Sequence, residues 1–413
     1  MKASLRQQAD RILSASIQAV LPDAAVIRAL EGRSFPGRVI LVAAGKAAWQ
    51  MAKTAYDCLG SQITEGIIIT KYGHSKGPVG NLICREAGHP IPDENSFLAT
   101  EEALRLTRQL SEEDTVLFLL SGGGSSLFES PLIDGSQLQT VTSQLLACGA
   151  DIREINTIRK RLSAVKGGRF ALHCAPARLF SLVLSDIIGD PLDMIASGPA
   201  CPDSSTCEQA LGVVQKYGLS FPARILSLLE QETPGELTNV TTQITGSVRQ
   251  LCEAAAAACR ELGYEPHILT DQLNGQAREA GSFLASIART HAGQGGKRAF
   301  IAGGETVVTL TGNGKGGRNQ ELVLAAAAGI EGLENVAIFS IGSDGTDGPT
   351  DAAGGYADGT TAALLRRKGI HIHEVLRNNN SYYALEQTQG LIFTGPTGTN
   401  VNDVAVLLLD TPV

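Results

Sequence analysis

The sequence predicts an α/β protein of two domains, in which short buried strands alternate with helices. Apolar runs, of which residues 115–120 and 179–184 are the clearest, have the continuous hydrophobic character of strands buried on both faces of a sheet. Helical patterns separate these runs, which is typical of an α/β fold. At 413 residues the chain is also longer than one hydrophobic core usually supports, so two domains are expected.

Composition limits the classes of partner and the compartment. The net charge is −8 and the Lys and Arg residues are dispersed, which argues against a nucleic-acid partner. The eight cysteines form no C-x-x-C pair, so neither a disulfide framework nor a structural zinc site is expected. Residues 1–21 are typical of an amphipathic helix rather than a signal peptide, and no apolar run reaches membrane-spanning length. We therefore expect a soluble, cytoplasmic protein.

Hydrophobic periodicity predicts the order of the elements. Strands are expected at residues 38–44, 66–70, 82–86, 115–120, 179–184, 266–270, 298–302, 336–341 and 404–409. Helices are expected at residues 49–59, 95–110, 135–148, 276–290 and 322–330, and a further helix contains the alanine run 254–258. The charged run 151–165 is interpreted as a solvated helix face. Residues 202–245 lack strand periodicity, and the Pro-Gly stretch at 231–235 predicts a linker between domains 1–235 and 236–413.

Polar groups follow three strands of the N-terminal half. Lys46 follows strand 38–44, a loop of three glycines and three serines follows strand 115–120, and Asp186 follows strand 179–184. Carboxyl ends of parallel strands meet at one edge of a sheet, where open α/β sheets bind ligands, so these groups are expected to form one site. The alternatives are that Lys46 is an exposed residue at a helix start and that Asp186 caps a helix. His89, in a loop bracketed by prolines, is interpreted as structural rather than as a substrate contact.

A second glycine-rich loop lies in the C-terminal half. A β-type run at residues 306–311 precedes four glycines within residues 312–317, and an Ala- and Leu-rich helical pattern follows. Free N–H groups, Lys315 and Arg318 at a helix N-terminus favour an anion, phosphate above all. Two other interpretations remain: a dinucleotide-binding G-x-G-x-x-G loop and a solvated hairpin turn. No Gly-Lys pair is followed by Ser or Thr, so a Walker A loop is excluded.

Residues for anion binding and for a metal ion can be assigned from these loops. The residues predicted to bind nucleotide or substrate anions are Ser121, Gly122, Gly123, Gly124, Ser125, Ser126, Gly304, Glu305, Gly312, Gly314, Lys315, Gly316 and Gly317. Asp344 and Asp347 follow strand 336–341 at alternate spacing with glycine, which resembles a cation loop but lacks the twelfth-position glutamate of an EF-hand. We predict that they contact Mg²⁺; a plain multi-turn loop is the alternative.

Together these groups supply what phosphoryl transfer requires. Cations and N–H groups spread charge away from the phosphoryl group, a carboxylate accepts the proton of the acceptor hydroxyl, and carboxylates hold Mg²⁺. No H-E-x-x-H, G-x-S-x-G or Ser-His-Asp order is present. The residues thus favour a kinase that acts on a small hydroxyl compound.

The sequence also resembles the glycerate 2-kinases of the MOFRL type over nearly its whole length. The blocks that carry the resemblance are Gly45-Lys46-Ala47-Ala48, Leu120-Ser121-Gly122-Gly123-Gly124-Ser125-Ser126, Leu184-Ser185-Asp186-Ile187-Ile188-Gly189-Asp190, Gly303-Gly304-Glu305-Thr306, Gly314-Lys315-Gly316-Gly317-Arg318-Asn319-Gln320-Glu321 and Gly342-Ser343-Asp344-Gly345-Thr346-Asp347-Gly348. This resemblance implies a Rossmann-like larger N-terminal domain with a mostly parallel sheet, a smaller C-terminal α/β domain with a mixed sheet, and a cleft between them.

The same resemblance implies an activity and roles for particular residues. It implies transfer of phosphate from ATP, with Mg²⁺, to D-glycerate, and Lys46, Asp186 and Arg318 as the functional residues. We also expect the protein to form a homodimer. The alternatives are an NAD(P)-dependent hydroxypyruvate reductase, which the G-x-G-x-x-G pattern favours, and a non-catalytic sensor of a phosphorylated metabolite.

Overall fold

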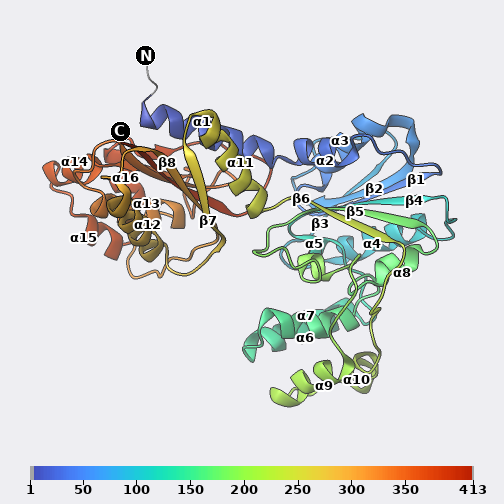
Figure 1. Cartoon of the computed structure of the whole chain (residues 1–413). Coiled ribbons are helices and arrows are strands. Elements are labelled where there is room, and N and C mark those ends of the chain that lie inside the picture. The colour runs from blue at the N-terminus through green and yellow to red at the C-terminus, as the bar shows by residue number, and fades with distance from the viewer. Residues whose placement is uncertain (1–3, 412–413) are drawn as a thin grey trace. The chain divides into compact units, whose positions relative to one another are not determined.

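The computed structural model describes residues 4–411, which divide into two compact units. The N-terminal unit comprises residues 25–245, and the C-terminal unit combines residues 4–24 with residues 246–411. This division differs from the expected boundary after residue 235, because the first helix belongs to the C-terminal unit and residues 231–235 lie inside the N-terminal unit. In each unit, helices pack on a six-stranded sheet (Figure 1).

The sheet of the N-terminal unit has the strand order β3-β2-β1-β4-β5-β6. Its strands are β1 Val39–Ala44, β2 Ile63–Lys71, β3 Ile83–Ala87, β4 Thr115–Leu120, β5 Arg178–Leu184 and β6 Val240–Gly246. The pairs β1–β2, β1–β4, β2–β3 and β4–β5 are parallel. This is the strand order of the Rossmann fold, and the order reverses between β1 and β4, which is where such sheets bind ligands. The predicted Rossmann-like domain is confirmed.

Both faces of this sheet are covered, which explains its unbroken apolar strands. Along β1, Ile40 and Val42 face one hydrophobic cluster and Leu41 and Ala43 face the other. One cluster lies under α4 Glu94–Leu106, α5 Gly124–Leu127 and α8 Arg169–Cys174, and the other under α2 Pro22–Leu30 and α3 Ala48–Leu59 (Figure 1). Strands buried on both faces need no polar alternation.

Four helices of the N-terminal unit pack around a separate small core. They are α6 Gly135–Ala147, α7 Ile152–Arg161, α9 Cys207–Lys216 and α10 Ala223–Leu229. The interpretation of residues 151–165 as a solvated face is wrong for the end of α7. Arg161 is fully buried and donates hydrogen bonds to Ser205 and Glu232, and Lys160 donates to Asp203 at 3.0 Å. The acids that pair with these cations are remote in sequence, so local charge pattern could not reveal the burial.

The C-terminal unit contains a mixed sheet of order β11-β10-β9-β12-β8-β7. Its strands are β7 Glu265–Leu273, β8 Gly296–Gly304, β9 Val336–Gly342, β10 Gly354–Asp358, β11 Leu391–Ile392 and β12 Asp403–Thr411. β7 and β8 are parallel, and the remaining neighbours are antiparallel. Its helices are α1 Leu5–Ala19, α11 Val248–Glu261, α12 Ala277–His291, α13 Arg318–Gly329, α14 Thr361–Arg367, α15 Ile372–Arg377 and α16 Ser381–Gln387. The mixed sheet agrees with the prediction.

The N-terminal helix α1 is part of this core. Ile12 and Leu13 of α1 lie in one buried cluster with Leu251 and Ala255 of α11 and with Phe339 of β9. Ser4 begins the helix as its N-cap, and its hydroxyl accepts the N–H of Gln7. Segments that are far apart in the sequence thus share one hydrophobic core.

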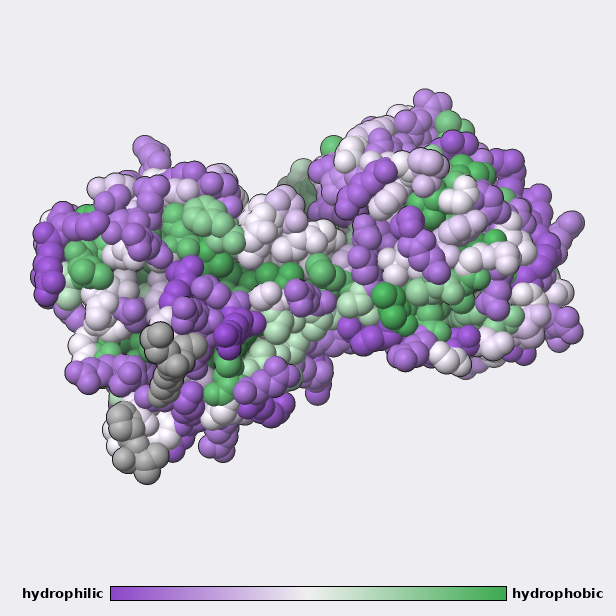
Figure 2. Space-filling view, turned by 90° about the horizontal axis from the view of Figure 1, so that it is seen from above, coloured by the Kyte–Doolittle hydropathy of each residue, from purple (hydrophilic) through white to green (hydrophobic). Residues whose placement is uncertain are grey.

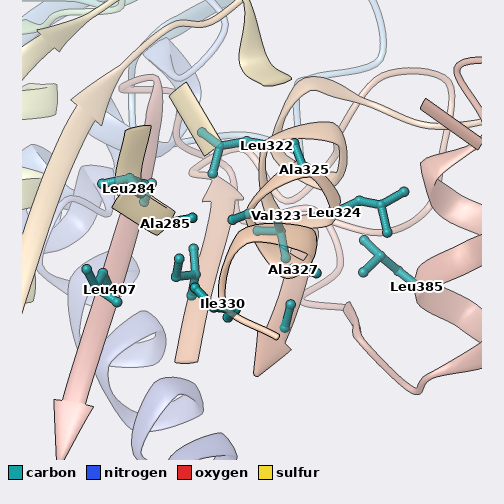
Figure 3. Packing of buried hydrophobic residues seen from close by; sticks show 14 of the residues in the cluster. Leu284, Ala285, Leu322, Val323, Leu324, Ala325, Ala327, Ile330, Leu385 and Leu407 are labelled. Atoms are coloured by element: carbon teal, nitrogen blue, oxygen red, sulfur yellow. The ribbon is translucent and has the colours of Figure 1, made fainter. Parts of the chain in front are cut away.

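Helix α13 is buried on all sides, as expected for a helix that is apolar around its whole circumference. In Figure 3, Leu324 points toward Leu385 of α16, on the side opposite Leu284 and Ala285 of α12. A Cβ on Gly281 of α12 would lie 2.0 Å from the carbonyl oxygen of Leu322, so the two helices touch closely. The first residue of α13 is Arg318, which is thereby attached to a rigid element.

The β-type run expected at residues 306–311 is not a strand. Only Val307 forms an isolated bridge, with Gln276, and Leu310 is 81% exposed. The alternating pattern has no neighbouring strand to pair with, and β8 ends earlier, at Gly304. The dinucleotide fingerprint therefore lacks the strand that must directly precede its loop.

The visible face in Figure 2 is largely hydrophilic, with hydrophobic residues interspersed. Among residues 4–411, no single helix is long and apolar enough to cross a membrane; α1 and α2 pass that test only as a pair bent by 53°.

Candidate functional site

Backbone hydrogen bonds join the loops that follow β1 and β4. The N–H of Lys46 donates to the carbonyl oxygen of Gly122 at 2.9 Å, and the N–H of Ala47 donates to Oγ of Ser121 at 3.0 Å. Gly45 adopts a φ of +129°, and a Cβ on it would lie 2.2 Å from Oγ of Ser121. Only glycine fits there. Lys46 is consequently held beside the glycine-rich loop.

Each of the three glycines of this loop contacts a different segment. A Cβ on Gly122 would lie 2.2 Å from Oδ2 of Asp186, and one on Gly124 would lie 2.7 Å from Cβ of Ala196. A Cβ on Gly123 would meet His89 at 2.9 Å and Lys46 at 3.4 Å. The loop therefore lies at the centre of a cluster formed by Lys46, Asp186 and His89, as the strand-end argument predicted for the first two.

The same loop retains donors for an anion. Within residues 4–411, the N–H groups of Gly123 and Ser125 have no acceptor, whereas those of Ser121 and Gly124 are bonded inside the fold. Gly123 has a φ of +87°, a left-handed conformation that occurs in anion-binding backbone turns. The Ser125 hydroxyl lies 3.3 Å from that of Ser197. Two N–H groups beside the side chain of Lys46 suit a phosphate or carboxylate oxygen.

Two basic side chains donate hydrogen bonds to the backbone of the loop at residues 121–126. The carbonyl oxygen of Ser125 accepts hydrogen bonds from Lys166 at 2.9 Å and from Arg159 at 3.2 Å. Lys166 is itself paired with the fully buried Glu129 at 3.2 Å. Burial lowers the pKa of Lys166 to about 8. Sequence reasoning missed this network because its members are separated along the chain and resemble ordinary surface charges.

In the C-terminal unit, Arg318 is held by two carboxylates. Its Nε and Nη2 donate to the two oxygens of Asp403, the latter at 3.0 Å, and its Nη1 donates to Glu305 at 2.8 Å. Burial alone would lower the pKa of Arg318, but the hydrogen bonds and charges of Asp403 and Glu305 raise it. Asp403 pairs with both Gly304 of β8 and Gly342 of β9, so it lies where these strands end. The guanidinium is charged and its orientation is fixed.

The second glycine-rich loop is folded on a run of three asparagines. The N–H groups of residues 311–315 donate to Asn378, Asn379 and Asn380, and a Cβ on Gly312 or Gly314 would lie 2.4 Å from an oxygen of Asn378. In the described part of the chain, only the N–H groups of Gly316 and Gly317, within this loop, meet no acceptor. The donors available for an anion are thus fewer than the sequence suggested.

The side chain of Lys315 contacts an aromatic ring and a carboxylate of the same unit. Its ammonium lies 4.0 Å from the centre of the Tyr382 ring and 3.8 Å from Asp351. Its side chain is half exposed, so this contact is weak.

The two aspartates predicted to contact a metal differ in environment. Both oxygens of Asp347 accept N–H groups at the start of α13, from Asn319 at 3.1 Å and from Gln320 at 2.9 Å, and burial raises its pKa to about 7. Asp344 is partly exposed, and its Oδ1 accepts the N–H of Thr346. No group of three or more His, Cys, Asp or Glu side chains within residues 4–411 is placed to hold a metal ion. The geometry favours helix capping for Asp347.

The chain matches two family models, and they cover both halves. Residues 8–230 match the model described as "Domain of unknown function (DUF4147)", and residues 298–403 match the "MOFRL family". A "D-glycerate 2-kinase" of Thermotoga maritima is 52% identical, over 98% of this chain and 99% of that one. A "Glycerate 2-kinase" of Pyrococcus horikoshii is 41% identical, over 98% and 97%.

A solved structure agrees with these matches. The crystal structure of a glycerate kinase from Thermotoga maritima superimposes with a TM-score of 0.95 and covers 98% of this chain and 99% of its own. The chain belongs to the MOFRL-type glycerate kinases.

Within this family fold, the site residues named from the sequence fall into two groups. Lys46, Asp186 and the loop of residues 121–126 lie together in the N-terminal unit, and Arg318 and Glu305 lie together in the C-terminal unit. His89 and Asp403 were not assigned to the site from the sequence. Asp403 directly precedes the strand predicted at residues 404–409 and is the first residue of β12, but no local pattern linked it to Arg318.

Proposed function

We propose that this chain is a glycerate 2-kinase, which transfers the γ-phosphate of ATP to the 2-hydroxyl of D-glycerate and releases 2-phosphoglycerate and ADP. The observation that carries the proposal is the cluster of Lys46, Asp186 and unbonded loop N–H groups around Gly122 and Gly123. It combines an acceptor for a proton with donors for an anion, which a phosphoryl transfer to an alcohol requires. The names of the relatives support the choice of glycerate.

In this mechanism, Asp186 acts on the acceptor hydroxyl. The oxygen of the 2-hydroxyl bonds to the γ-phosphorus while its proton passes to the Asp186 carboxylate. The bond from the γ-phosphorus to the bridging oxygen breaks, and its electron pair leaves with ADP. Lys46 neutralises charge on the transferred group, and the N–H groups of Gly123 and Ser125 hold one of the substrate anions.

Arg318 is assigned to the transferred phosphoryl group. Its two carboxylate partners hold the guanidinium in one orientation, and a preorganised cation of this kind contributes roughly 10³–10⁵ in rate to phosphoryl transfer. Gly304, Gly312, Gly314, Lys315, Gly316 and Gly317 remain proposed nucleotide contacts; the N–H groups of Gly316 and Gly317 support that role.

Mg²⁺ is part of the proposal. Asp344 fits the ion best, because Mg²⁺ prefers oxygen ligands and one Asp344 oxygen is not used by the Thr346 N–H. Asp347 fits less well, since both of its oxygens already accept backbone N–H groups. When bound with ATP, the ion neutralises charge on the β- and γ-phosphates.

A coupled assay tests the activity and its rival together. Purified protein with D-glycerate and Mg²⁺-ATP is expected to form ADP and 2-phosphoglycerate, and NADH is not expected to be oxidised with hydroxypyruvate. Oxidation of NADH without ADP formation would support the reductase, and ligand binding without either turnover would support the sensor.

Variants test the assigned roles. Asp186→Asn is expected to lower kcat by about 10²–10⁴-fold, because the general base is lost. Arg318→Ala is expected to lower kcat by roughly 10³-fold or more. Wild-type turnover in either variant, with the fold intact by circular dichroism, would remove that residue from the mechanism.

The cytoplasmic location and the homodimeric state of the protein are further proposals. All eight cysteines are free thiols, which supports a reducing, cytoplasmic compartment. The homodimer is tested by light scattering of the purified protein.

A further inference from the structure

One polar side chain beside the Gly122–Gly123 turn has no role in the mechanism above. His89 lies in the loop between β3 and α4 and is half buried. A Cβ on Gly123 would lie 2.9 Å from Cδ2 and 3.2 Å from Nε2 of the His89 ring, and 3.4 Å from Cγ of Lys46. The imidazole and the Lys46 side chain therefore flank the same glycine, next to the proposed anion donors.

The backbone fixes the position of this ring. A Cβ on Gly88 would lie 2.6 Å from the carbonyl oxygen of Ile91 and 2.9 Å from Cγ of Asp93, so the loop is tightly folded. Asp93 attaches it to the rest of the unit, because its carboxylate accepts the N–H of Ser96 at 3.0 Å and the hydroxyl of Tyr72 at 2.6 Å. The ring is held at the site without contributing a hydrogen bond of its own.

The imidazole has no hydrogen-bonding partner among residues 4–411. The titratable groups that face it are Lys46, Lys71 and His74, all of them basic. Burial and these charges lower the pKa of His89 below its ordinary value. The ring is therefore neutral at physiological pH, with one nitrogen that donates and one that accepts.

The chemistry of a neutral imidazole indicates which part of the acceptor it binds. A carboxylate or phosphate is an acceptor only, and the ammonium of Lys46 and the loop N–H groups match it. A hydroxyl is both a donor and an acceptor, which matches a neutral imidazole. The 2-hydroxyl is assigned to Asp186, which leaves the 3-hydroxyl of glycerate without a partner.

We propose that His89 binds the 3-hydroxyl of the acceptor and thereby selects a 2,3-dihydroxy acid over a monohydroxy acid. This inference rests on the proposed function, and it concerns substrate choice rather than the transfer step. A half-buried polar ring that is left unpaired in the absence of the hydroxyl adds to the discrimination.

The test compares D-glycerate with D-lactate, which has a methyl group in place of the CH₂OH group. We expect His89→Ala to lower kcat/KM for D-glycerate by about 10–100-fold, the effect of removing one partner of a buried hydrogen bond. The inhibition constant of D-lactate should change by less than about threefold, since D-lactate lacks the hydroxyl. His89→Gln, which keeps a donor and an acceptor, should recover part of the lost kcat/KM.

The controls separate this inference from a structural role and from the proposed function. Ile91→Ala alters a 65% exposed side chain in the same loop and should leave both constants unchanged. An equal loss for D-glycerate and D-lactate in His89→Ala, or unchanged kcat/KM for D-glycerate, would overturn the role of His89. An inactive wild-type enzyme would instead refute the proposed kinase.

Discussion

At the scale of single residues, Gly122 lies directly against the carboxylate of Asp186, the proposed general base. Because a Cβ on Gly122 would lie 2.2 Å from Oδ2 of Asp186, the variant Gly122→Ala must displace the carboxylate. A shift of about 1 Å at a reacting group can lower the rate on the order of 10²-fold. We expect this loss in kcat with a melting temperature close to that of the wild type.

A matched glycine controls for the substitution itself. Gly235→Ala, in the same unit, places a methyl group where no atom lies within 4 Å and where φ is not positive, so kcat should stay unchanged. If Gly122→Ala kept wild-type kcat, the Gly122–Asp186 contact would have no bearing on catalysis.

Asp114 gives the N-terminal unit a specific response to acid. Its carboxylate accepts hydrogen bonds from Nε of Arg38 at 3.0 Å and from the N–H of Ser111 at 2.8 Å, and the hydrogen bond from Arg38 holds its pKa below the ordinary range. A lowered pKa stabilises the fold above the unfolded value, near 4, and this stabilisation is lost as the pH falls further.

The expected result is a pH-dependent difference between two proteins. Asp114→Asn should lower the free energy of unfolding by about 1–3 kcal/mol at pH 7, and the difference should shrink as the pH falls below about 4. Denaturant titrations at several pH values measure it. A difference that is constant from pH 7 to pH 3 would contradict the assignment.

The sequence could predict some site residues and not others for a physical reason. Lys46 and Asp186 could be predicted to lie at the same edge of the sheet, because a residue that follows a buried parallel strand has a known position there. The contact of His89 with Gly123 and that of Asp403 with Arg318 could not be predicted, because each joins segments that are distant in the sequence. The asparagines at residues 378–380, which bond the N–H groups of the glycine-rich loop, were hidden for the same reason.

At the scale of elements, the contact between α12 and α13 links packing to the position of Arg318. Gly281→Ala would place a methyl group 2.0 Å from the carbonyl oxygen of Leu322 and push the helices apart. Overpacking of this kind costs about 1–3 kcal/mol. We expect a lower melting temperature together with reduced kcat, because α13 begins at Arg318.

Gly212→Ala, in a helix of the N-terminal unit, is the matched control, and it is expected to stabilise the protein rather than destabilise it. Gly212 is an exposed residue of α9 with no atom within 4 Å of the added Cβ, so alanine should stabilise the helix by about 0.5–1 kcal/mol. Thermal unfolding of both variants gives the comparison. A neutral Gly281→Ala would show that α12 and α13 can separate without cost.

Element prediction found the strands that are buried on both faces, and it erred at one alternating run and at one polar strand. The strands β1, β4 and β5 are buried on both faces, so an apolar run was sufficient to find them. The run at residues 306–311 alternates like a strand but has no sheet beside it. β6, in contrast, carries the polar sequence VTTQITG and was missed because its apolar pattern is weak.

At the scale of the whole molecule, helix α1 belongs to the C-terminal unit although it precedes the N-terminal unit in the sequence. Residues 25–245 form a compact unit without it, whereas α1 contributes Ile12 and Leu13 to the core around α11. A fragment of residues 246–413 alone should therefore expose that apolar surface and be unstable. Adding residues 1–24 as a peptide should restore cooperative unfolding.

Calorimetry of the fragment with and without the peptide measures this effect. A peptide in which Ile12 and Leu13 are replaced by Ser is the matched control, and it should not rescue the fragment. A fragment that unfolds cooperatively by itself would contradict the role of α1. The division of the chain could not be derived from the sequence, because an amphipathic helix does not show which distant core it covers.

The placement of α1 also has a consequence during synthesis on the ribosome. Its apolar face is translated before its partner α11, which begins only at Val248. At about 5–20 residues per second the nascent helix waits on the order of 10–50 seconds for that partner, while the intervening unit can already fold. Over this interval the apolar face of α1 lacks the partner that buries it in the folded chain, so it can be bound by chaperones that recognise apolar segments.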